Sequence, residues 1–562
     1  AEAAMVKYRE DKKMDKKKIV KINDRNIYLA SVAYSFLLGA SFVFGRSLYD
    51  DWGIEKKDFL MWLAVSGVLL CVFPHIMKFI LDRSKKHLLR KVSEFGLKRW
   101  AIRSIAILVC WLPYFLTFYP GNGSSDSYST ILQVKGAWPL SNHHPVMFTL
   151  FVKLCLKIGE SLGGGTGEGI AVFSVAQMLL MAFAFSACVE WMKSRGISRL
   201  WQWVATLFWA LNPIIALYSI TMWKDVLFSI WILLFVIYLY DAVMREPEYV
   251  SSAKSLTLLG GVSLLTAFGR NNGIYIVVLV LAALILVYRK YWKRLLSFSM
   301  ILVTAVVLIQ GPGYEMLGIE KGSFAESVAI PLQQIGHTVA GNGKMTEEQE
   351  EFIDHLLPVE TIKEVYDPYM VDAIKFNEGF DKSYLENNKM EFLWTWAKMF
   401  PENLKGYIEA YALQTLGYWY VDITNWKCTF GLEYTDKYEV NIVQNLTGID
   451  SSTLFQNMIV RNDMTPVIRY LFKVALPVWL GLLVCFIMIL QRRKKYILSL
   501  LPLIGTWGTL MIATPVYCEF RYMFGLHLSL PVLGAFLFHM TEISMFMPRQ
   551  HDMKERKVCF EK

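Results

Sequence analysis

The chain has 562 residues, of which 54% are hydrophobic, 14% aromatic and only 19% charged. Soluble domains carry about 25% charged residues, so this composition excludes an ordinary soluble enzyme and indicates a protein of the lipid bilayer. The formal net charge of +10 does not indicate a nucleic-acid partner, because the basic residues gather in short loops between apolar segments.

Apolar runs define the predicted fold class. Runs of about 17 to 25 apolar residues are long enough to cross a bilayer core about 30 Å thick. The chain contains about twelve such runs, near 28–49, 58–80, 101–118, 168–192, 201–218, 225–243, 255–269, 272–288, 295–310, 467–491, 497–516 and 523–543. The sequence therefore predicts an all-α polytopic membrane protein with about twelve transmembrane helices.

The basic loops predict the orientation of these helices. A cytoplasmic N-terminus puts every strongly basic short loop on the cytoplasmic side, as the positive-inside rule requires. Those loops are Arg83–Arg103, Lys193–Arg199, Arg289–Arg294, Arg492–Lys495 and the tail after Arg549. We therefore expect a multi-pass protein of the plasma (cytoplasmic) membrane with both termini in the cytoplasm.

Two large loops then lie outside the membrane, at 119–167 and 311–466. The second holds 24 acidic and 11 basic residues between Tyr314 and Met464, and it is expected to be a mostly helical extracytoplasmic domain that repels nucleic acid. The predicted division is a cytoplasmic tail (1–27), two transmembrane helices with a basic loop (28–100), a transmembrane module (101–310), the external domain (311–466), C-terminal transmembrane helices (467–543) and a second cytoplasmic tail (544–562).

The first external loop carries a carboxylate and two imidazoles. Asp126 follows Pro120-Gly-Asn-Gly-Ser-Ser, and His143 and His144 precede Pro145. Such groups at a surface can perform general acid–base chemistry. Each also has an ordinary structural interpretation: Asp126 as a helix cap or turn residue, and the histidines as an exposed pair before a proline turn.

Two further clusters fall on the same predicted side. Lys224 and Asp225 open the sixth apolar run; Asp225 can cap that helix, whereas a lysine beside the positive end of a helix can bind an anion. Arg270 and Asn271 lie in a turn that is flanked by glycines. An arginine there can bind a ligand or anchor the chain at the interface.

A fourth cluster, Glu519 and Arg521, precedes the last run, and these two residues can also simply pair with each other. Taken together, Lys224, Arg270 and Arg521 can neutralise the phosphate of a lipid carrier, because guanidinium groups bind phosphate bidentately. Gln334 belongs to a stretch early in the external domain that is expected to line the same site. The residues predicted to bind the donor or acceptor sugar are His143, His144, Asp225, Asn271, Glu519 and Gln334.

The layout resembles the C-fold (GT-C) superfamily of integral membrane glycosyltransferases, which includes the protein O-mannosyltransferases and the lipid A aminoarabinose transferases. The resemblance rests on Pro120–Asp126, the triplet His143–Pro145 and the motif Glu519–Tyr522. It implies a catalytic acidic residue directly after a transmembrane helix and a polyprenyl-phosphate-linked sugar donor. This chain differs in having two added N-terminal runs, and Ser127 where the family pattern has a second acidic residue.

The resemblance implies inverting transfer, in which Asp126 takes the proton of an acceptor hydroxyl and polyprenyl phosphate leaves. The expected acceptor is a glycopolymer or glycolipid of the cell envelope. No nucleotide is required and no residue is assigned as a metal ligand, although a divalent metal stays an open alternative. A transporter or flippase of a lipid-linked sugar is the main alternative function, and a scaffold subunit is the third. Transporters place binding groups near the bilayer midplane, so the outer position favours the transferase.

Overall fold

The computed structural model describes residues 23–86, 94–245, 247–423, 427–432, 442–445, 448–466, 469 and 472–543. These residues form helices joined by loops, with isolated bridges but no strand among them, which confirms the all-α class. The predicted tails over 1–22 and 544–562, and the middle of the first basic loop at 87–93, lie outside the described residues.

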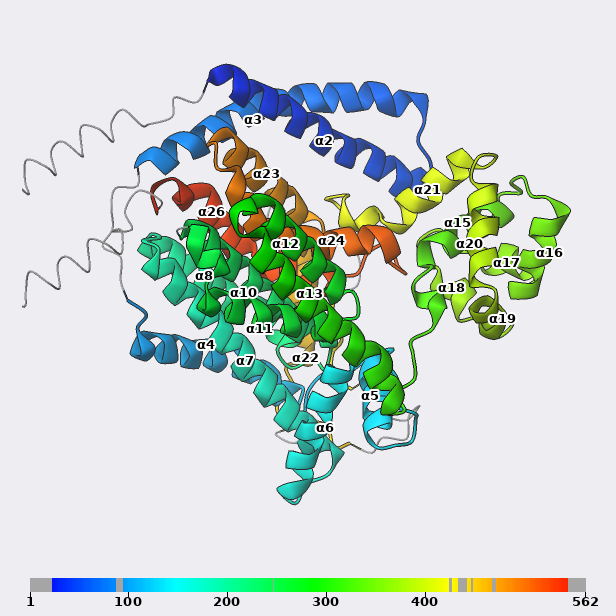
Figure 1. The fold of residues 1–562 in the computed structure, drawn as a ribbon, viewed down its shortest axis with the longest axis horizontal. Helices are drawn as coiled ribbons and strands as arrows, with labels where there is room; N and C mark the ends of the chain where they lie inside the picture. Colours follow the sequence, from blue (N-terminus) through cyan, green and yellow to red (C-terminus); the bar gives the residue numbers. More distant parts are fainter. Residues whose placement is uncertain are drawn as a thin grey trace, which may run out of the picture.

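The apolar runs fold as helices, most of them long (Figure 1). They are α2 (Asp24–Asp51), α3 (Lys56–Lys86), α4 (Leu97–Thr117), α7 (Thr166–Ser194), α8 (Arg199–Leu211), α9 (Pro213–Tyr218), α10 (Lys224–Met244), α11 (Ala253–Gly269), α12 (Gly273–Val287), α13 (Trp292–Leu308), α23 (Leu476–Leu490), α24 (Leu501–Ala513), α25 (Phe524–Leu528) and α26 (Leu530–Ile543).

Eight helical segments of the described chain are long and apolar enough to cross a membrane, and α11, α12 and α23 are shorter apolar helices. The protein is therefore a polytopic membrane protein. The run predicted at 201–218 is not one helix, because α8 ends at Leu211 and a new helix begins at Pro213. Asn212 caps that helix by accepting a hydrogen bond from the Ile214 N–H at 3.0 Å. The total of twelve crossings stays a prediction.

Ion pairs hold together one end of the helix bundle. Glu190 of α7, whose side chain is fully buried, pairs with Arg99 (2.9 Å) and Arg103 (3.1 Å) of α4. Arg195, just after α7, pairs with Asp241 of α10 at 2.5 Å. These residues flank loops that the sequence predicts to be cytoplasmic, and pairing compensates charges that would otherwise be buried alone.

The opposite end gathers the loops that are predicted to be external. The Asn271 side chain donates to the Asn142 carbonyl at 2.7 Å, and Asn272 donates to Thr509 of α24 at 2.7 Å. A separate group of small helices also lies on this side, at the right of Figure 1 and away from α8. The two kinds of loop therefore lie at different ends of the bundle.

The small helices belong to the predicted external domain, and most of them share a core of their own. The helices of the predicted segment 311–466 are α14 (Tyr314–Met316), α15 (Ala329–Ala340), α16 (Glu347–Leu356), α17 (Val359–Val365), α18 (Asp372–Lys375), α19 (Lys382–Asn387), α20 (Lys389–Met399), α21 (Leu404–Gln414) and α22 (Ser452–Met464). Residues from Ala325 to Tyr407 form one hydrophobic cluster, whereas Leu413 and Tyr418 pack in the main core. Tyr314 and Ile319 form a third, small cluster with Val146, so the segment predicted as one domain is divided among three cores.

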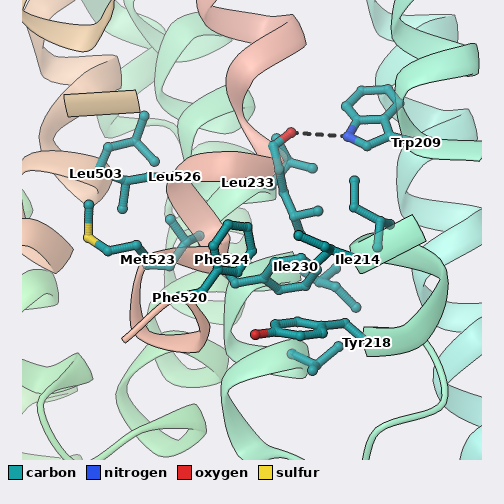
Figure 2. Close-up of a cluster of buried hydrophobic side chains, with 14 of the residues drawn as sticks. Trp209, Ile214, Tyr218, Ile230, Leu233, Leu503, Phe520, Met523, Phe524 and Leu526 are labelled. Atoms are coloured by element: carbon teal, nitrogen blue, oxygen red, sulfur yellow. Dashed lines mark hydrogen bonds between the residues drawn. The ribbon is translucent and has the colours of Figure 1, made fainter. Parts of the chain in front are cut away.

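A dense aromatic core lies beneath the outer loops and fixes the helices that carry them (Figure 2). Trp209 of α8 donates to the Leu528 carbonyl at 3.1 Å. The ring centroid of Tyr218 lies 4.4 Å from that of Phe524 and 5.2 Å from that of Trp223. All five side chains are almost fully buried. This packing fixes the beginning of α10 relative to the segment that leads into α25.

Candidate active site

The turn that presents Asp126 is held by hydrogen bonds to two other segments. The Asn122 N–H donates to the Ile220 carbonyl (2.8 Å), and the Met222 N–H donates to the Asn122 carbonyl (3.0 Å). The side-chain oxygen of Asn122 accepts from the Gly431 N–H at 2.8 Å. Since Asn122 is fully buried, these bonds fix the beginning of α5 (Ser125–Val134) beside the segment that precedes α10.

Asp126 lies in the first turn of α5 but does not cap this helix. Ser124 is the N-cap residue, and its N–H donates to Ser127 Oγ at 3.0 Å. The Asp126 carboxylate instead contacts Arg521 Nη1 at 2.8 Å and Lys224 Nζ at 3.5 Å. The interpretation of Asp126 as a helix cap is therefore wrong, and its side chain serves as the partner of two cations.

These two cations keep Asp126 ionised. Burial raises the pKa of Asp126. The charges of Lys224 and Arg521 lower it by a larger amount, so the pKa of this carboxyl is held well below its usual range. The Asp126 side chain is 30% exposed, so a ligand can reach it. While both cations are bound the carboxylate is a weak base, and it becomes a stronger base when another anion draws them away.

His144 joins Lys224 to α5. Lys224 Nζ lies 2.8 Å from His144 Nδ1, and Ser129 Oγ lies 2.9 Å from His144 Nε2. Burial and the charge of Lys224 lower the pKa of His144 well below its usual value, so the ring is neutral. Because an ammonium group only donates, Nδ1 accepts and Nε2 carries the hydrogen. Ser129 accepts this hydrogen and donates its own to the Asp126 carbonyl at 2.9 Å.

A second ion pair lies beside the first. Asp225 in the first turn of α10 has a side chain only 2% exposed, and its Oδ1 lies 3.1 Å from Arg270 Nη1. The Arg270 guanidinium also lies 4.5 Å from the ring centroid of Tyr522, within the range of a cation–π interaction. The turn after α11 is thus tied to α10 and to the segment that follows α24.

Arg521 connects two carboxylates. Its Nε lies 3.6 Å from Glu519 Oε1, whereas its Nη1 lies 2.8 Å from Asp126. The pairing of Glu519 with Arg521 that the sequence allowed is present, but it is the longer of the two. Burial raises the pKa of Glu519 to about 7, Asp225 and Asp126 add to the increase, and Arg521 opposes it. Asp126 and Glu519 therefore differ strongly in their affinity for a proton.

The four sequence clusters thus meet at one end of the bundle, around Arg521 and Lys224. The family described as "Family of unknown function (DUF6020)" matches residues 135–550. The chain belongs to this family. The match includes every cation of the cluster and begins after Asp126. No curated protein and no solved structure matches the chain.

Three other predicted site residues lie differently in this DUF6020 member. His143 is exposed, and its ring centroid lies 4.7 Å from that of His144. Asn271 holds the first external loop through its bond to the Asn142 carbonyl. Gln334 is not brought to the cluster: it is buried in α15, where its amide bonds the Tyr407 carbonyl (3.0 Å) and the Trp396 indole (2.8 Å). Its polar atoms support the core of the small helical domain instead.

Sequence reasoning missed several side chains of the cluster. Ser129 follows Asp126 by three residues on α5, which places both on one helix face, and this spacing could have identified it. Trp223 and Tyr522 each neighbour a predicted cation in the sequence, and their ring centroids lie 5.4 and 5.1 Å from the Arg521 guanidinium. Aromatic rings next to cations are a usable signal, because cation–π contacts stabilise such pairs.

Metal binding was left open by the sequence. Among the described residues, no group of three or more His, Cys, Asp or Glu side chains has an arrangement that could hold a metal ion. The carboxylates Asp126, Asp225 and Glu519 each face a cation instead. The chemistry that these residues can supply is binding of an anion and proton transfer.

Gly273 is expected to be essential for the position of Arg270. Its N–H donates to the Arg270 carbonyl at 2.8 Å, and a methyl group at this glycine would overlap the Thr266 carbonyl. Gly273→Ala should therefore lower the stability in detergent by about 1–3 kcal/mol, as overpacking does. Gly261→Ala in the preceding helix α11 is the control, because its methyl group would meet no atom within 4 Å. Equal melting temperatures for the two variants would contradict the expectation.

Proposed function

We propose that the chain is an integral membrane glycosyltransferase that moves a sugar from a polyprenyl-phosphate carrier to a cell-envelope glycopolymer or glycolipid. The observation that carries the proposal is the convergence of Lys224, Arg270 and Arg521 with Asp126 at one end of an apolar helix bundle. A lipid phosphate reaches such a position from the bilayer surface with its chain beside apolar helices. Fixed cations there stabilise the charge that grows on a leaving phosphate.

The donor phosphate competes with Asp126 for its two cations. Arg521 and Lys224 contact the carboxylate through Nη1 and Nζ, and both groups bind phosphate oxygens well. When the phosphate takes over these contacts, Asp126 regains basicity and accepts the proton of the acceptor hydroxyl. That hydroxyl attacks the anomeric carbon from the side opposite the phosphate, which inverts the configuration.

Sugar hydroxyls are assigned to the polar groups that surround the cations. His143 is exposed at the cluster and His144 bonds Lys224, so both lie where the sugar of a bound donor would be. Asp225 and Glu519 complete the set as acceptors of hydroxyl hydrogens. Asn271 borders the same site through Asn142.

The finer architecture belongs to the same proposal. We assign the chain a GT-C-like fold with about twelve crossings in the plasma membrane, termini in the cytoplasm and the site outside. The separation of loops supports this orientation, because the arginine-rich end of α4 and α7 lies away from the site. Basic loops remain in the cytoplasm when membrane proteins insert.

The test uses the purified protein in liposomes, radiolabelled sugars on polyprenyl phosphate and an extract of envelope acceptors. The parent protein should release free polyprenyl phosphate and label the acceptor. Lys224→Ala should abolish the release, whereas Lys57→Ala, whose side chain is 64% exposed, should retain it. If the parent moves intact lipid-linked sugar between leaflets without cleaving it, the protein is a transporter or flippase. If both activities are absent across the common donors, the scaffold alternative holds.

A further inference from the structure

Glu519 lies in a buried environment that a role as an acceptor of sugar hydroxyl hydrogens does not explain. The residue is 8% exposed and pairs with Arg521 at 3.6 Å. Neither Glu519 Oε1 nor Arg521 Nε has a hydrogen-bond partner in the described part of the chain. Buried polar atoms are nearly always hydrogen-bonded in folded proteins, so these two atoms, which face each other at 3.6 Å, can each still bond a ligand.

Negative and neutral groups dominate the surroundings of Glu519. The titratable and charged groups that act on it come from α5, α9, α10, η5 (Leu416–Tyr418) and η8 (Arg521–Met523). They are Asp126, Tyr218, Asp225, Tyr418, Arg521 and Tyr522. A single positive charge among these groups therefore faces the carboxylate.

Charge balance decides the state of Glu519 when a donor binds. The cluster contains three cations and three carboxylates, namely Lys224, Arg270, Arg521, Asp126, Asp225 and Glu519. With every group ionised the cluster is neutral, and a phosphodiester adds one negative charge. An uncompensated charge in a buried site is costly, so one carboxylate is expected to take up a proton.

The contacts select which carboxylate takes the proton. Asp126 contacts Arg521 at 2.8 Å and Lys224 at 3.5 Å, and Asp225 contacts Arg270 at 3.1 Å. The cation nearest to Glu519 is the Arg521 guanidinium, at the longer distance of 3.6 Å, and the backbone N–H of Arg521 also bonds this carboxylate. The pKa of Glu519 is raised to about 7, with burial as the main cause, while that of Asp126 is held well below its usual range. Carboxyl groups with pKa values pushed apart in this way divide into an acid and a base.

We propose that Glu519 is a second catalytic residue: it is protonated in the donor complex and gives its hydrogen to the phosphate oxygen that leaves the sugar. This inference rests on the proposed function. The bond between the anomeric carbon and the phosphate oxygen breaks, and its electron pair stays on that oxygen, which takes the Glu519 proton. The acceptor oxygen bonds the anomeric carbon and loses its own proton to Asp126. Both carboxyl groups then exchange protons with water before the next turnover.

The experiment measures binding of a short-chain prenyl methyl phosphate to the full-length protein in detergent at pH 6 and pH 8. This probe is a diester, so its own charge stays constant over this range. Since the proton on Glu519 favours binding and is lost as the pH rises through about 7, the parent should bind about tenfold more tightly at pH 6 than at pH 8. Glu519→Gln carries a permanent hydrogen donor and should bind equally well at both values.

Asp126→Asn tests the charge balance. It removes the charge of a carboxylate that is ionised at both pH values, so the probe then adds no uncompensated charge, and the variant should bind it more tightly than the parent and with a weaker pH dependence. A Glu519→Gln variant with the pH dependence of the parent would overturn the role of Glu519 and leave the transferase intact. If probe binding by the parent protein did not depend on pH, the role of Glu519 would also be overturned and the transferase left intact. No binding by the parent at either pH would reject the phosphate site itself, and with it the proposed function.

Discussion

Replacing Asp126 with asparagine is expected to slow sugar transfer by about 10²- to 10⁴-fold, the contribution of a positioned general base. Asparagine keeps the size of the side chain but cannot accept the proton of the acceptor hydroxyl. The loss should appear in kcat and not as weaker donor binding, because the variant leaves Arg521 and Lys224 free for the phosphate. Initial rates of polyprenyl phosphate release over a range of donor concentrations separate the two effects.

Asp50→Asn provides the control for this experiment. Asp50 is 50% exposed and pairs with Arg46 within α2, so its replacement should leave the rate unchanged. An Asp126→Asn protein with the rate of the parent would show that another group accepts the proton. A variant that loses donor binding together with the rate would instead assign Asp126 a structural role at its two cations.

The membrane helices could be predicted from the sequence because hydropathy and length are local properties. A run such as 225–243 is largely apolar between Asp225 and Asp241, and the helix formed there is α10, Lys224–Met244. The run at 201–218 was wrongly predicted as one helix. Hydropathy averaged over a window does not show that Asn212 and Pro213 end one helix and begin another. Proline lacks an N–H and favours the first position of a new helix.

The helix α6 (Val146–Ser161) was assigned to an external loop. Its apolar residues are interrupted by Lys153 and Lys157, so no uninterrupted run marks it. The close packing of α6 on α7 depends on Gly159, where a methyl group would overlap the backbone of Gly169. Contacts of this kind join residues on different elements, and no periodic pattern within one segment reveals them.

The predicted topology indicated in outline which residues would lie near one another, because the loops on one side of a membrane share a small area. Which side chain meets which was not predictable. The sequence allowed Arg521 either to bind a phosphate or to pair with its neighbour Glu519, yet its shorter contact is to Asp126, 395 residues away in sequence. The prediction for Gln334 failed for a different reason: the group of small helices that contains it has its own core and uses the amide there.

Arg521→Met is expected to be the most damaging substitution for stability. It leaves the buried Glu519 and the partly buried Asp126 without their shared guanidinium, and removal of one partner from a buried ion pair costs about 3–5 kcal/mol. The double variant Arg521→Met/Asp126→Asn should recover part of this loss, because one unpaired carboxylate is then gone. Thermal unfolding of the purified proteins measures this cycle, and strictly additive effects would contradict a direct interaction between the two residues.

Arg521→Lys tests what the guanidinium contributes beyond its charge. An ammonium group is a single point charge, whereas the planar guanidinium offers Nη1 to Asp126 and Nε to Glu519 at the same time. The lysine variant should therefore fold, yet transfer sugar at least about tenfold more slowly, since losing one charge-assisted hydrogen bond costs about 1.5–3 kcal/mol. The pH dependence of phosphodiester binding should also change, because an ammonium group that pairs with Asp126 lies farther from Glu519 and opposes its protonation less. A lysine variant with parental rates would mean that positive charge alone is required, and that the two carboxylates act independently of each other.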